Sequence, residues 1–142
     1  MKVFITGGSG LTGPSIVSEL IAAGHTVTGL ARSDKAAARL RGLGADVLHG
    51  SLDDIDILKK GAEASEGVIH MAFGGDFADP TEMARRDTEA IAALGEALVA
   101  SNKPFVSTSG TFVMAGGHVS KEQDAPDGES LAAFRIPASR LV

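Results

Sequence analysis

Short apolar runs alternate along this chain with longer segments whose apolar residues recur every three or four positions. The runs predict buried strands, and the three-to-four spacing predicts helices with one buried face. Five strands are expected, at residues 2–5, 26–30, 45–50, 67–73 and 105–109. Helices are expected at residues 14–23, 36–41, 55–62 and 81–101, a loop at 74–80, and a further helix that begins near Ala138, after Pro137.

This alternation of strand and helix predicts an α/β fold with a doubly wound parallel sheet. Right-handed crossover connections make 3-2-1-4-5 the expected order of the strands. A length of 142 residues suits a single domain with a sizeable core. Residues 1–142 are therefore expected to form one domain.

The turn after the first strand is rich in glycine and reads Thr6-Gly7-Gly8-Ser9-Gly10-Leu11-Thr12-Gly13. Glycine permits a tight turn and a close approach of the backbone to phosphate, and the new helix directs its free N–H groups at the anion. Because 18 of the 142 residues are glycine, such spacing arises by chance in roughly one sequence of this kind in four. The glycines alone therefore do not identify a phosphate-binding loop, and the neighbouring elements must be considered. The apolar strand before it and the amphipathic helix after it favour a loop that binds a dinucleotide pyrophosphate over a turn that only joins two elements.

The residues after the second strand bear on the choice of dinucleotide. Arg32, Ser33 and Lys35 offer a guanidinium, a hydroxyl and an ammonium group, which suit the 2′-phosphate of NADP. Asp34 is the carboxylate that would instead bind the ribose hydroxyls of NAD. It lies three residues beyond the expected strand end, where it would begin the next helix, alone or with Ser33 as the cap. NADP is therefore expected rather than NAD, and the alternative for Arg32 is a solvated surface charge.

Ligands of open parallel sheets bind at the carboxyl ends of the strands. After the third strand, Ser51 and the backbone of Leu52 are expected to contact adenine. Asp53 and Asp54 follow, and we expect them to occupy the N-terminus of the next helix, where the helix dipole favours carboxylates.

The ends of the fourth and fifth strands are expected at the other half of the same ligand. Met71, Ala72 and Phe73 are predicted to lie on the ribose side of the cofactor. Ser109 and Thr111 lie at the carboxyl end of the fifth strand and are expected to place hydroxyl groups toward the nicotinamide. Ser109, with Thr111, is the candidate to bond a carbonyl or hydroxyl group of a small-molecule substrate.

Three other polar regions have simpler interpretations. His70 lies within an apolar strand and is expected to be a buried residue with satisfied hydrogen bonds rather than a ligand. Residues 85–87 and Glu96 are expected to form a solvated face of the fourth long helix. Residues 116–128 are polar and rich in turn formers, as is typical of a lid or substrate-facing loop.

Composition excludes several classes of function. A net charge of −5 without a basic block argues against nucleic acid or an anionic membrane as the main partner. The absence of cysteine excludes disulfides, thiol catalysis and thiolate metal sites, and no metal is expected. No apolar run approaches 18 residues and the chain starts without a signal segment, so a cytoplasmic protein is expected.

Together these motifs resemble the extended short-chain dehydrogenase/reductase superfamily, the NAD-dependent epimerases and dehydratases. Residues 6–13 are similar to its Thr-Gly-x-x-Gly-x-x-Gly fingerprint, and residues 68–73 to its Val-Ile-His-x-Ala-Gly strand. Residues 50–54 resemble its Gly-Asp-(Ile/Leu)-x-(Asp/Asn) adenine turn, with serine in place of the usual aspartate. Residues 107–111 resemble its Ser-Ser-(Ser/Thr) active-site segment, which implies that Ser109 carries the catalytic hydroxyl. The resemblance implies an NAD(P)-binding Rossmann domain, and pairing of two copies through the fourth and fifth helices.

Two departures from the family pattern matter. The sequence contains no tyrosine, so the catalytic Tyr-x-x-x-Lys dyad is absent. Ile136 and Arg140 occupy its two positions, and Arg135 is an alternative occupant of the first. In these respects the chain is similar to the atypical subgroup, which keeps the cofactor site and loses the dyad. Family members are also longer, so we expect this chain to be an N-terminal part that ends before the last strands and the substrate domain.

Two functions of different classes remain open from the sequence. The first is an NADP-dependent oxidoreductase or epimerase-like protein of the short-chain dehydrogenase/reductase type. The second is a non-catalytic NADP-binding module that acts as a sensor or regulatory partner, which the loss of the dyad favours. A third reading is a fragment too incomplete to bind the cofactor.

Overall fold

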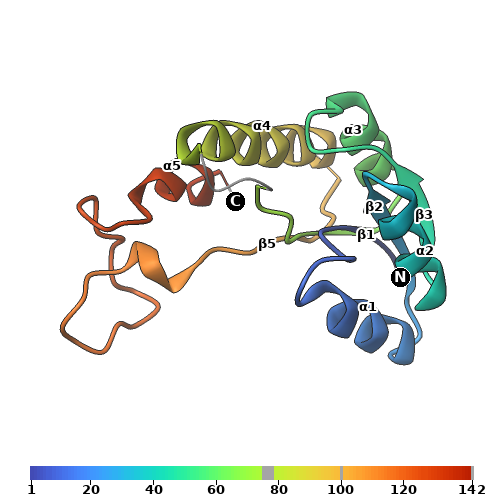
Figure 1. The fold of residues 1–142 in the computed structure, drawn as a ribbon, viewed down its shortest axis with the longest axis horizontal. Helices are drawn as coiled ribbons and strands as arrows, with labels where there is room; N and C mark the ends of the chain where they lie inside the picture. Colours follow the sequence, from blue (N-terminus) through green and yellow to red (C-terminus); the bar gives the residue numbers. More distant parts are fainter. Residues whose placement is uncertain (75–78, 100, 142) are drawn as a thin grey trace.

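The structure is a computed structural model, and it describes residues 1–74, 79–99 and 101–141. Its centre is a parallel sheet in the order β3-β2-β1-β4-β5 (Figure 1). The strands are β1 (Lys2–Thr6), β2 (Thr26–Ala31), β3 (Asp46–His49), β4 (Gly67–His70) and β5 (Phe105–Ser107). The predicted fold class and strand order are confirmed.

Two groups of helices enclose the sheet, as Figure 1 shows. One face carries α1 (Gly13–Ala22) and α2 (Asp34–Gly42), and the other carries α3 (Ile55–Glu63) and α4 (Pro80–Leu98). The C-terminal residues form two 3-10 turns, Thr111–Val113 and Ala133–Arg135, and the short helix α5 (Ile136–Ser139), which packs beside α4. Along the described residues, none of the helices combines the length and the apolar character needed to cross a membrane.

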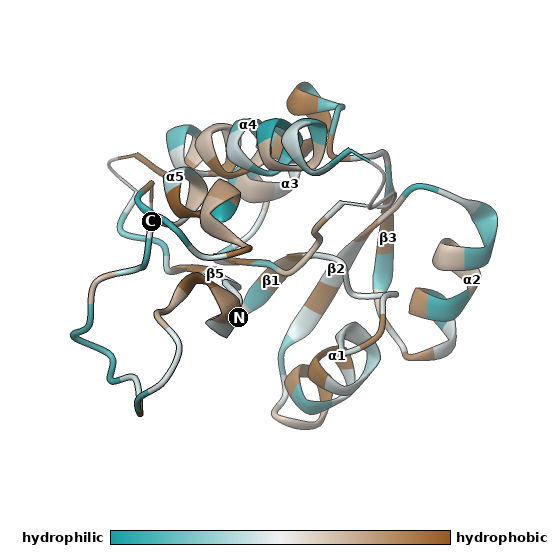
Figure 2. Ribbon diagram, turned by 60° about the vertical axis from the view of Figure 1, so that its left-hand side comes forward, coloured by the Kyte–Doolittle hydropathy of each residue, from teal (hydrophilic) through white to brown (hydrophobic). Residues whose placement is uncertain are grey.

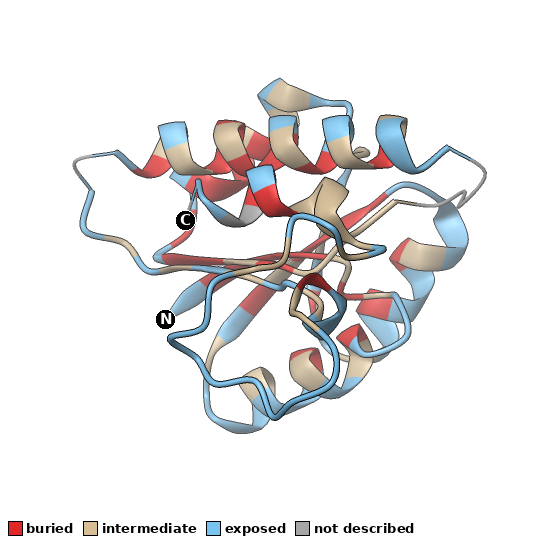
Figure 3. Ribbon diagram, turned by 90° about the vertical axis from the view of Figure 1, so that its left-hand side faces the viewer, coloured by how far each residue is buried: buried red, intermediate tan, exposed pale blue. Residues whose placement is uncertain are grey.

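The core consists of two layers because neighbouring residues of a strand point to opposite faces of the sheet. On β1, Phe4 packs with Leu58 and Leu94 beneath α3 and α4. Ile5 packs on the other side, with Val17 and Leu40 of α1 and α2. Figure 2 shows the matching alternation of hydrophobic and hydrophilic residues along α1 and α4, and Figure 3 shows the buried residues along the sheet and the inner helix faces.

Some predicted boundaries differ from the observed ones. The fourth strand ends at His70 rather than at residue 73, and residues 71–73 continue as irregular backbone. The last helix begins at Ile136 rather than near Ala138, because Pro137 fits within the first turn of a helix. Of the loop expected at 74–80, residues 75–78 lie outside the described residues, as does residue 100 near the end of the fourth predicted helix.

Candidate functional site

The glycine turn lies at the carboxyl end of β1 and is packed tightly at both of its ends. Gly7 has a φ of 77°, and a Cβ there would lie 2.6 Å from the backbone nitrogen of Ala72. A Cβ at Gly13 would overlap the carbonyl oxygens of Gly7 and Gly8. Only glycine therefore fits at these two positions, which hold the turn against β4 and against the start of α1.

Gly10, in the middle of the turn, has more room around it than Gly7 or Gly13. A Cβ there would meet only the Gly7 carbonyl oxygen, at 3.1 Å. The next helix, α1, begins three residues later with Pro14 in its first turn, and Thr12 makes no side-chain cap. Backbone N–H groups at such a helix start attract anions. The turn is thus closed on its protein side and open toward the position where a pyrophosphate would bind.

A chain of buried polar side chains ties the sheet to α4 beside this turn. The Nδ1 atom of His70 lies 2.8 Å from the Thr6 hydroxyl oxygen, and its Nε2 lies 3.1 Å from Oδ1 of Asp87. All three residues are at most 1% exposed. Since a carboxylate only accepts hydrogen bonds, Nε2 is the nitrogen that donates. The Ala72 backbone N–H completes the chain by donating to the Thr6 hydroxyl at 3.4 Å.

One of these residues confirms a prediction and another contradicts one. His70 is the buried, hydrogen-bonded residue that its apolar strand indicated. Asp87 was expected on a solvated face, and this is wrong, whereas Arg85 and Arg86 beside it are exposed. The helical spacing carries the information that this interpretation missed. Position 87 lies four residues after Met83 and in phase with three buried positions that follow it, Ala90, Ile91 and Leu94.

A hollow of about 480 Å³ lies between the ends of β2 and β3. Its lining comprises Ala31, Arg32, Ser33, Asp34, His49, Gly50, Ser51 and Asp54. The structure thus brings Arg32 and Ser33 together with Ser51, and it leaves the exposed Lys35 outside the lining. His49, at the end of β3, also belongs to the lining, although nothing in the sequence indicated it. Its Nε2 atom lies 3.5 Å from Nη2 of Arg41.

The side chains around this hollow already have partners of their own. Ser33 caps α2 by accepting a hydrogen bond from the Ala36 N–H at 3.3 Å, and Asp34 begins the helix, as expected. Oδ2 of Asp54 accepts from the Ser51 backbone N–H at 2.7 Å and from its hydroxyl at 2.9 Å. These two bonds, led by the backbone one, lower the pKa of the Asp54 carboxyl below its usual value.

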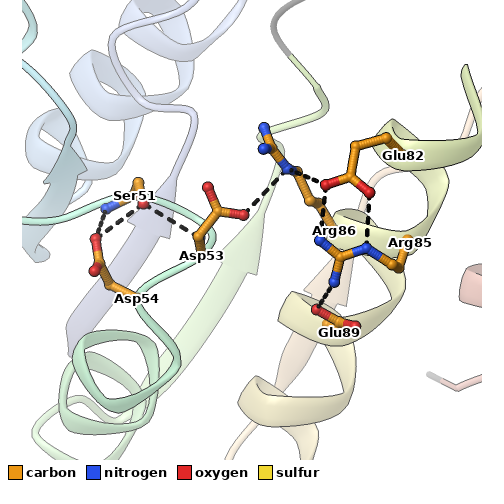
Figure 4. A network of polar contacts seen from close by, with 7 residues as sticks. All are labelled: Ser51, Asp53, Asp54, Glu82, Arg85, Arg86 and Glu89. Carbon is orange, nitrogen blue, oxygen red and sulfur yellow. Dashed lines mark hydrogen bonds and ion pairs between the residues drawn. The ribbon is translucent and has the colours of Figure 1, made fainter. Parts of the chain in front are cut away.

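The turn at residues 51–54 is also linked to α4, as Figure 4 shows. Arg86 reaches Oδ1 of Asp53 at 3.2 Å and Oε1 of Glu82 at 2.9 Å. Arg85 pairs with Glu82 and with Glu89 on the same helix, and hydrogen bonds from Arg85 are the main cause that lowers the pKa of Glu82 to about 2. Asp54 precedes α3 but makes no side-chain cap there, because its carboxylate turns back to Ser51. The half-buried side chain of Leu52 packs against the apolar core beneath α3 and α4.

A second cavity, of about 220 Å³, lies beyond the end of β5. Its lining comprises Asp87, Ile91, Ser107, Thr108, Ser109, Arg135 and Ala138. Ser109 lines this cavity, two residues beyond the end of β5, whereas Thr111 begins the next 3-10 turn and lies outside the lining.

Arg135 occupies this cavity rather than Arg140, which is exposed. Its guanidinium lies 3.8 Å from the centre of the Phe73 ring, and its Nη2 donates to the Thr108 carbonyl at 3.1 Å. The same Nη2 lies 3.8 Å from Oδ2 of Asp87, so that the buried polar chain continues into the cavity. Of the two sequence positions proposed for the missing tyrosine, Ile136 is buried in the core and Arg135 faces the cavity.

The remaining candidates lie around the glycine turn. Leu11 is 97% exposed at the tip of the turn. Met71, Ala72 and Phe73 are half-buried and follow β4, next to Gly7. The geometry thus forms a continuous edge: the 480 Å³ hollow at one end, the glycine turn in the middle and the 220 Å³ cavity at the other.

Comparison with known proteins identifies relatives by sequence and by structure. The chain is 48% identical over 132 residues to the uncharacterized protein YLL056C of Saccharomyces cerevisiae, covering 92% of this chain and 44% of that protein. It is 39% identical over 72 residues to a 4-hydroxy-2-methyl-3-oxo-4-farnesyl-3,4-dihydroquinoline-1-oxide ketoreductase of Stigmatella aurantiaca, covering 51% of this chain and 22% of that enzyme. The solved structure of MoeE5 in complex with UDP-glucose and NAD superimposes with a TM-score of 0.80 at 25% identity, over 99% of this chain and 48% of MoeE5.

The chain therefore spans less than half of the length of these relatives. The sequence pattern of the NAD dependent epimerase/dehydratase family matches residues 3–134, almost the whole chain. The resemblance to the short-chain dehydrogenase/reductase superfamily is confirmed, and this chain belongs to the NAD-dependent epimerase/dehydratase family.

Proposed function

We propose that this chain is the cofactor-binding part of an NADP-dependent oxidoreductase of the short-chain dehydrogenase/reductase type. The observation that carries the proposal is the glycine turn, which is closed against the protein at Gly7 and Gly13 and open at Gly10 beside an uncapped helix start. This geometry suits a pyrophosphate group. Two similar proteins support an oxidoreductase with a nicotinamide dinucleotide, since one is a ketoreductase and the other was solved in complex with NAD.

Each part of the edge has a role in this proposal. The backbone at Gly7, Gly10 and Gly13 holds the pyrophosphate, and Leu11 covers it. The remaining roles follow the strand ends. Arg32, Ser33 and Lys35 bind the 2′-phosphate, Ser51 and Leu52 flank adenine, and Thr6, Met71, Ala72 and Phe73 support the ribose on the nicotinamide side.

The preference for NADP rests on the composition of the 480 Å³ hollow. Arg32 is exposed at its wall and has a planar fork of donors that matches a phosphate. Asp34 also lines the hollow, but it is the first residue of α2, where its carboxylate complements the helix dipole. Lys35 lies outside the lining, so its contribution is that of a nearby positive charge.

The cofactor would supply the hydride, and this chain supplies binding and orientation. Ser109, with Thr111, is proposed to bond the carbonyl or hydroxyl group of the substrate at the end of β5. Because the sequence has no tyrosine, a phenol of this chain cannot deliver the proton, and water or another part of the protein would do so.

Calorimetric titration with NADP and NAD at low salt tests the proposal. The wild-type chain is expected to bind NADP, and Arg32→Ala is expected to weaken NADP binding about 10- to 100-fold, the range for losing hydrogen bonds to a charged group. NAD binding should change less than about twofold, since NAD lacks the 2′-phosphate. Arg85→Gln is the matched control, because Arg85 is an exposed arginine on α4 outside the hollow.

Failure of both nucleotides to bind would contradict the proposal, and the glycine turn would then only connect β1 to α1. Equal losses of NADP and NAD on Arg32→Ala would contradict the assignment of the 2′-phosphate.

The absence of tyrosine favours a second candidate, a non-catalytic NADP-binding module with a sensor or regulatory role. The two candidates differ in turnover. Oxidation of NADPH in the presence of a panel of aldehydes and ketones supports the oxidoreductase, and tight binding without any turnover supports the module.

A further inference from the structure

The 220 Å³ cavity presents a guanidinium at the place where the family pattern has its dyad. We propose that Arg135, together with Ser109, binds an uncharged carbonyl oxygen of the substrate, so that Arg135 is a substrate-binding residue in this chain. This inference rests on the proposed function, which it deepens by naming the chemical class of the group that enters the cavity.

The position of Arg135 is fixed before any ligand arrives. Its guanidinium lies over the Phe73 ring at 3.8 Å, and Phe73 in turn stacks on Phe134 with ring centroids 6.3 Å apart. The hydrogen bond to the Thr108 carbonyl holds its Nη2 from the side of β5. The side chain is only 16% exposed. A donor held in place in this way loses little conformational entropy when it binds an acceptor.

The guanidinium also keeps unused hydrogen-bonding capacity. An arginine side chain carries five N–H donors, and among the described residues the only hydrogen bond that the Arg135 side chain makes is the one to the Thr108 carbonyl. Its Nε atom is buried and has no hydrogen-bond partner in the described part of the chain. Ser109 contributes a hydroxyl group to the same cavity. The two side chains therefore offer donors to one oxygen acceptor.

The charge balance of the cavity distinguishes between acceptors. Asp87 lies 3.8 Å from Nη2 of Arg135, and its other oxygen is held by His70 at 3.1 Å. The positive charge of Arg135 is thus already opposed by a buried carboxylate. A ligand carboxylate would stand close to Asp87 and be repelled, whereas a neutral carbonyl oxygen accepts the hydrogen bond without that cost.

The test uses two small probes of nearly the same shape, isobutyramide with a neutral carbonyl and isobutyrate with a carboxylate. The ¹⁵N-labelled chain is titrated with each probe, with and without NADP, and the arginine Nε–H resonances are followed by NMR. The Arg135 resonance is identified by its loss in Arg135→Lys. We expect isobutyramide to shift this resonance saturably at millimolar concentration, and isobutyrate to bind at least about fivefold more weakly.

Ser109→Ala provides a second readout that does not depend on replacing Arg135, because Ser109 is exposed and its loss should leave the fold intact. We expect Ser109→Ala to weaken the binding of isobutyramide at least about threefold. The Nε–H resonance of the exposed Arg85 should not shift when the probe is added. Absence of any shift at Arg135 in the folded chain, or binding of isobutyrate as tight as that of isobutyramide, would overturn the inference. A chain that binds no NADP would instead refute the proposed function, and the titration without NADP would still decide the role of Arg135.

Discussion

The two ends of the edge are built in different ways. The hollow between β2 and β3 is lined by two short segments, residues 31–34 and 49–54, and most of its polar residues are exposed. The cavity beyond β5 is lined by residues from three separate segments, 87–91, 107–109 and 135–138, among them the buried Asp87 of α4 and Arg135 near the end of the chain. Local sequence therefore determines the first, whereas the second depends on how α4 and the C-terminal residues pack.

This difference suggests that the two ends respond differently to substitution. At the hollow, a side chain such as Arg32 is expected to be replaceable with little effect on the rest of the fold. At the cavity, Asp87 is bonded to His70 on β4 and lies beside Arg135, so the same carboxylate serves the core and the cavity. A change at Asp87 should therefore alter stability together with binding at the cavity.

The largest expected effect is that of Asp87→Ala. This substitution leaves the buried Nε2–H group of His70 without an acceptor and the guanidinium of Arg135 without its opposing carboxylate. We expect the free energy of unfolding to fall by about 3 kcal/mol or more, measured by urea denaturation. Loss of the buried partner should also release Arg135, so its Nε–H resonance should broaden or shift.

Two variants control this result. Asp87→Asn keeps an oxygen acceptor for His70, but it removes the charge and turns an NH2 group toward Arg135, so we expect a smaller loss of stability than in Asp87→Ala, about 1–2 kcal/mol. Glu89→Ala removes an exposed carboxylate from the same helix and should change stability by less than about 0.5 kcal/mol. If Asp87→Ala lowered the free energy of unfolding no more than Glu89→Ala does, the conclusion that Asp87 couples the core to the cavity would be wrong.

The next prediction separates the two roles of glycine within one turn. Gly13→Ala introduces a methyl group that overlaps two backbone carbonyl oxygens, and we expect it to lower the free energy of unfolding by about 2 kcal/mol. Gly10→Ala introduces a methyl group on the open side, and its effect on unfolding should stay below about 1 kcal/mol. NADP binding, measured by calorimetry, should nevertheless weaken at least about tenfold in Gly10→Ala, since the methyl occupies the approach of the pyrophosphate.

Equal losses of stability in these two variants would show that the turn is not open at Gly10. Unchanged NADP binding in Gly10→Ala would show that the pyrophosphate lies elsewhere.

The same division between local and distant residues explains what the sequence could predict. The strand order, the glycine turn and the positions of Arg32, Ser33 and Ser51 around one hollow follow from short motifs whose geometry is set by neighbouring residues. Ser109 lies two residues beyond the end of β5, at the carboxyl edge of the sheet. In these cases the relevant contacts involve residues close in sequence or the known arrangement of parallel strands.

The positions of Asp87 and Arg135 could not be predicted in this way. The charged run at residues 85–87 resembles a solvated face, and only its phase with the buried positions of α4 shows that one member points inward. The placement of Arg135 against Phe73 depends on how the C-terminal turn packs beside α4, over a sequence separation of about 60 residues. Such contacts result from tertiary packing, which overrides the local preferences of the residues.

The smallest expected effect concerns the exposed turn at the hollow. Hydrogen bonds from Ser51 lower the pKa of Asp54 in the folded state, so its ionised form stabilises the fold above its unfolded pKa of about 3.8, and this contribution is lost as the pH falls through the lower folded value. Asp54→Asn should therefore flatten the fall in stability below about pH 4, with only a small change at pH 7. Asp56→Asn, in the first turn of α3, is the control for replacing an exposed aspartate by asparagine. Urea denaturation between pH 3 and pH 7 measures the free energy of unfolding of both variants. If the change in Asp54→Asn were as large as the loss in Asp87→Ala, the hollow would be coupled to the core as strongly as the cavity is.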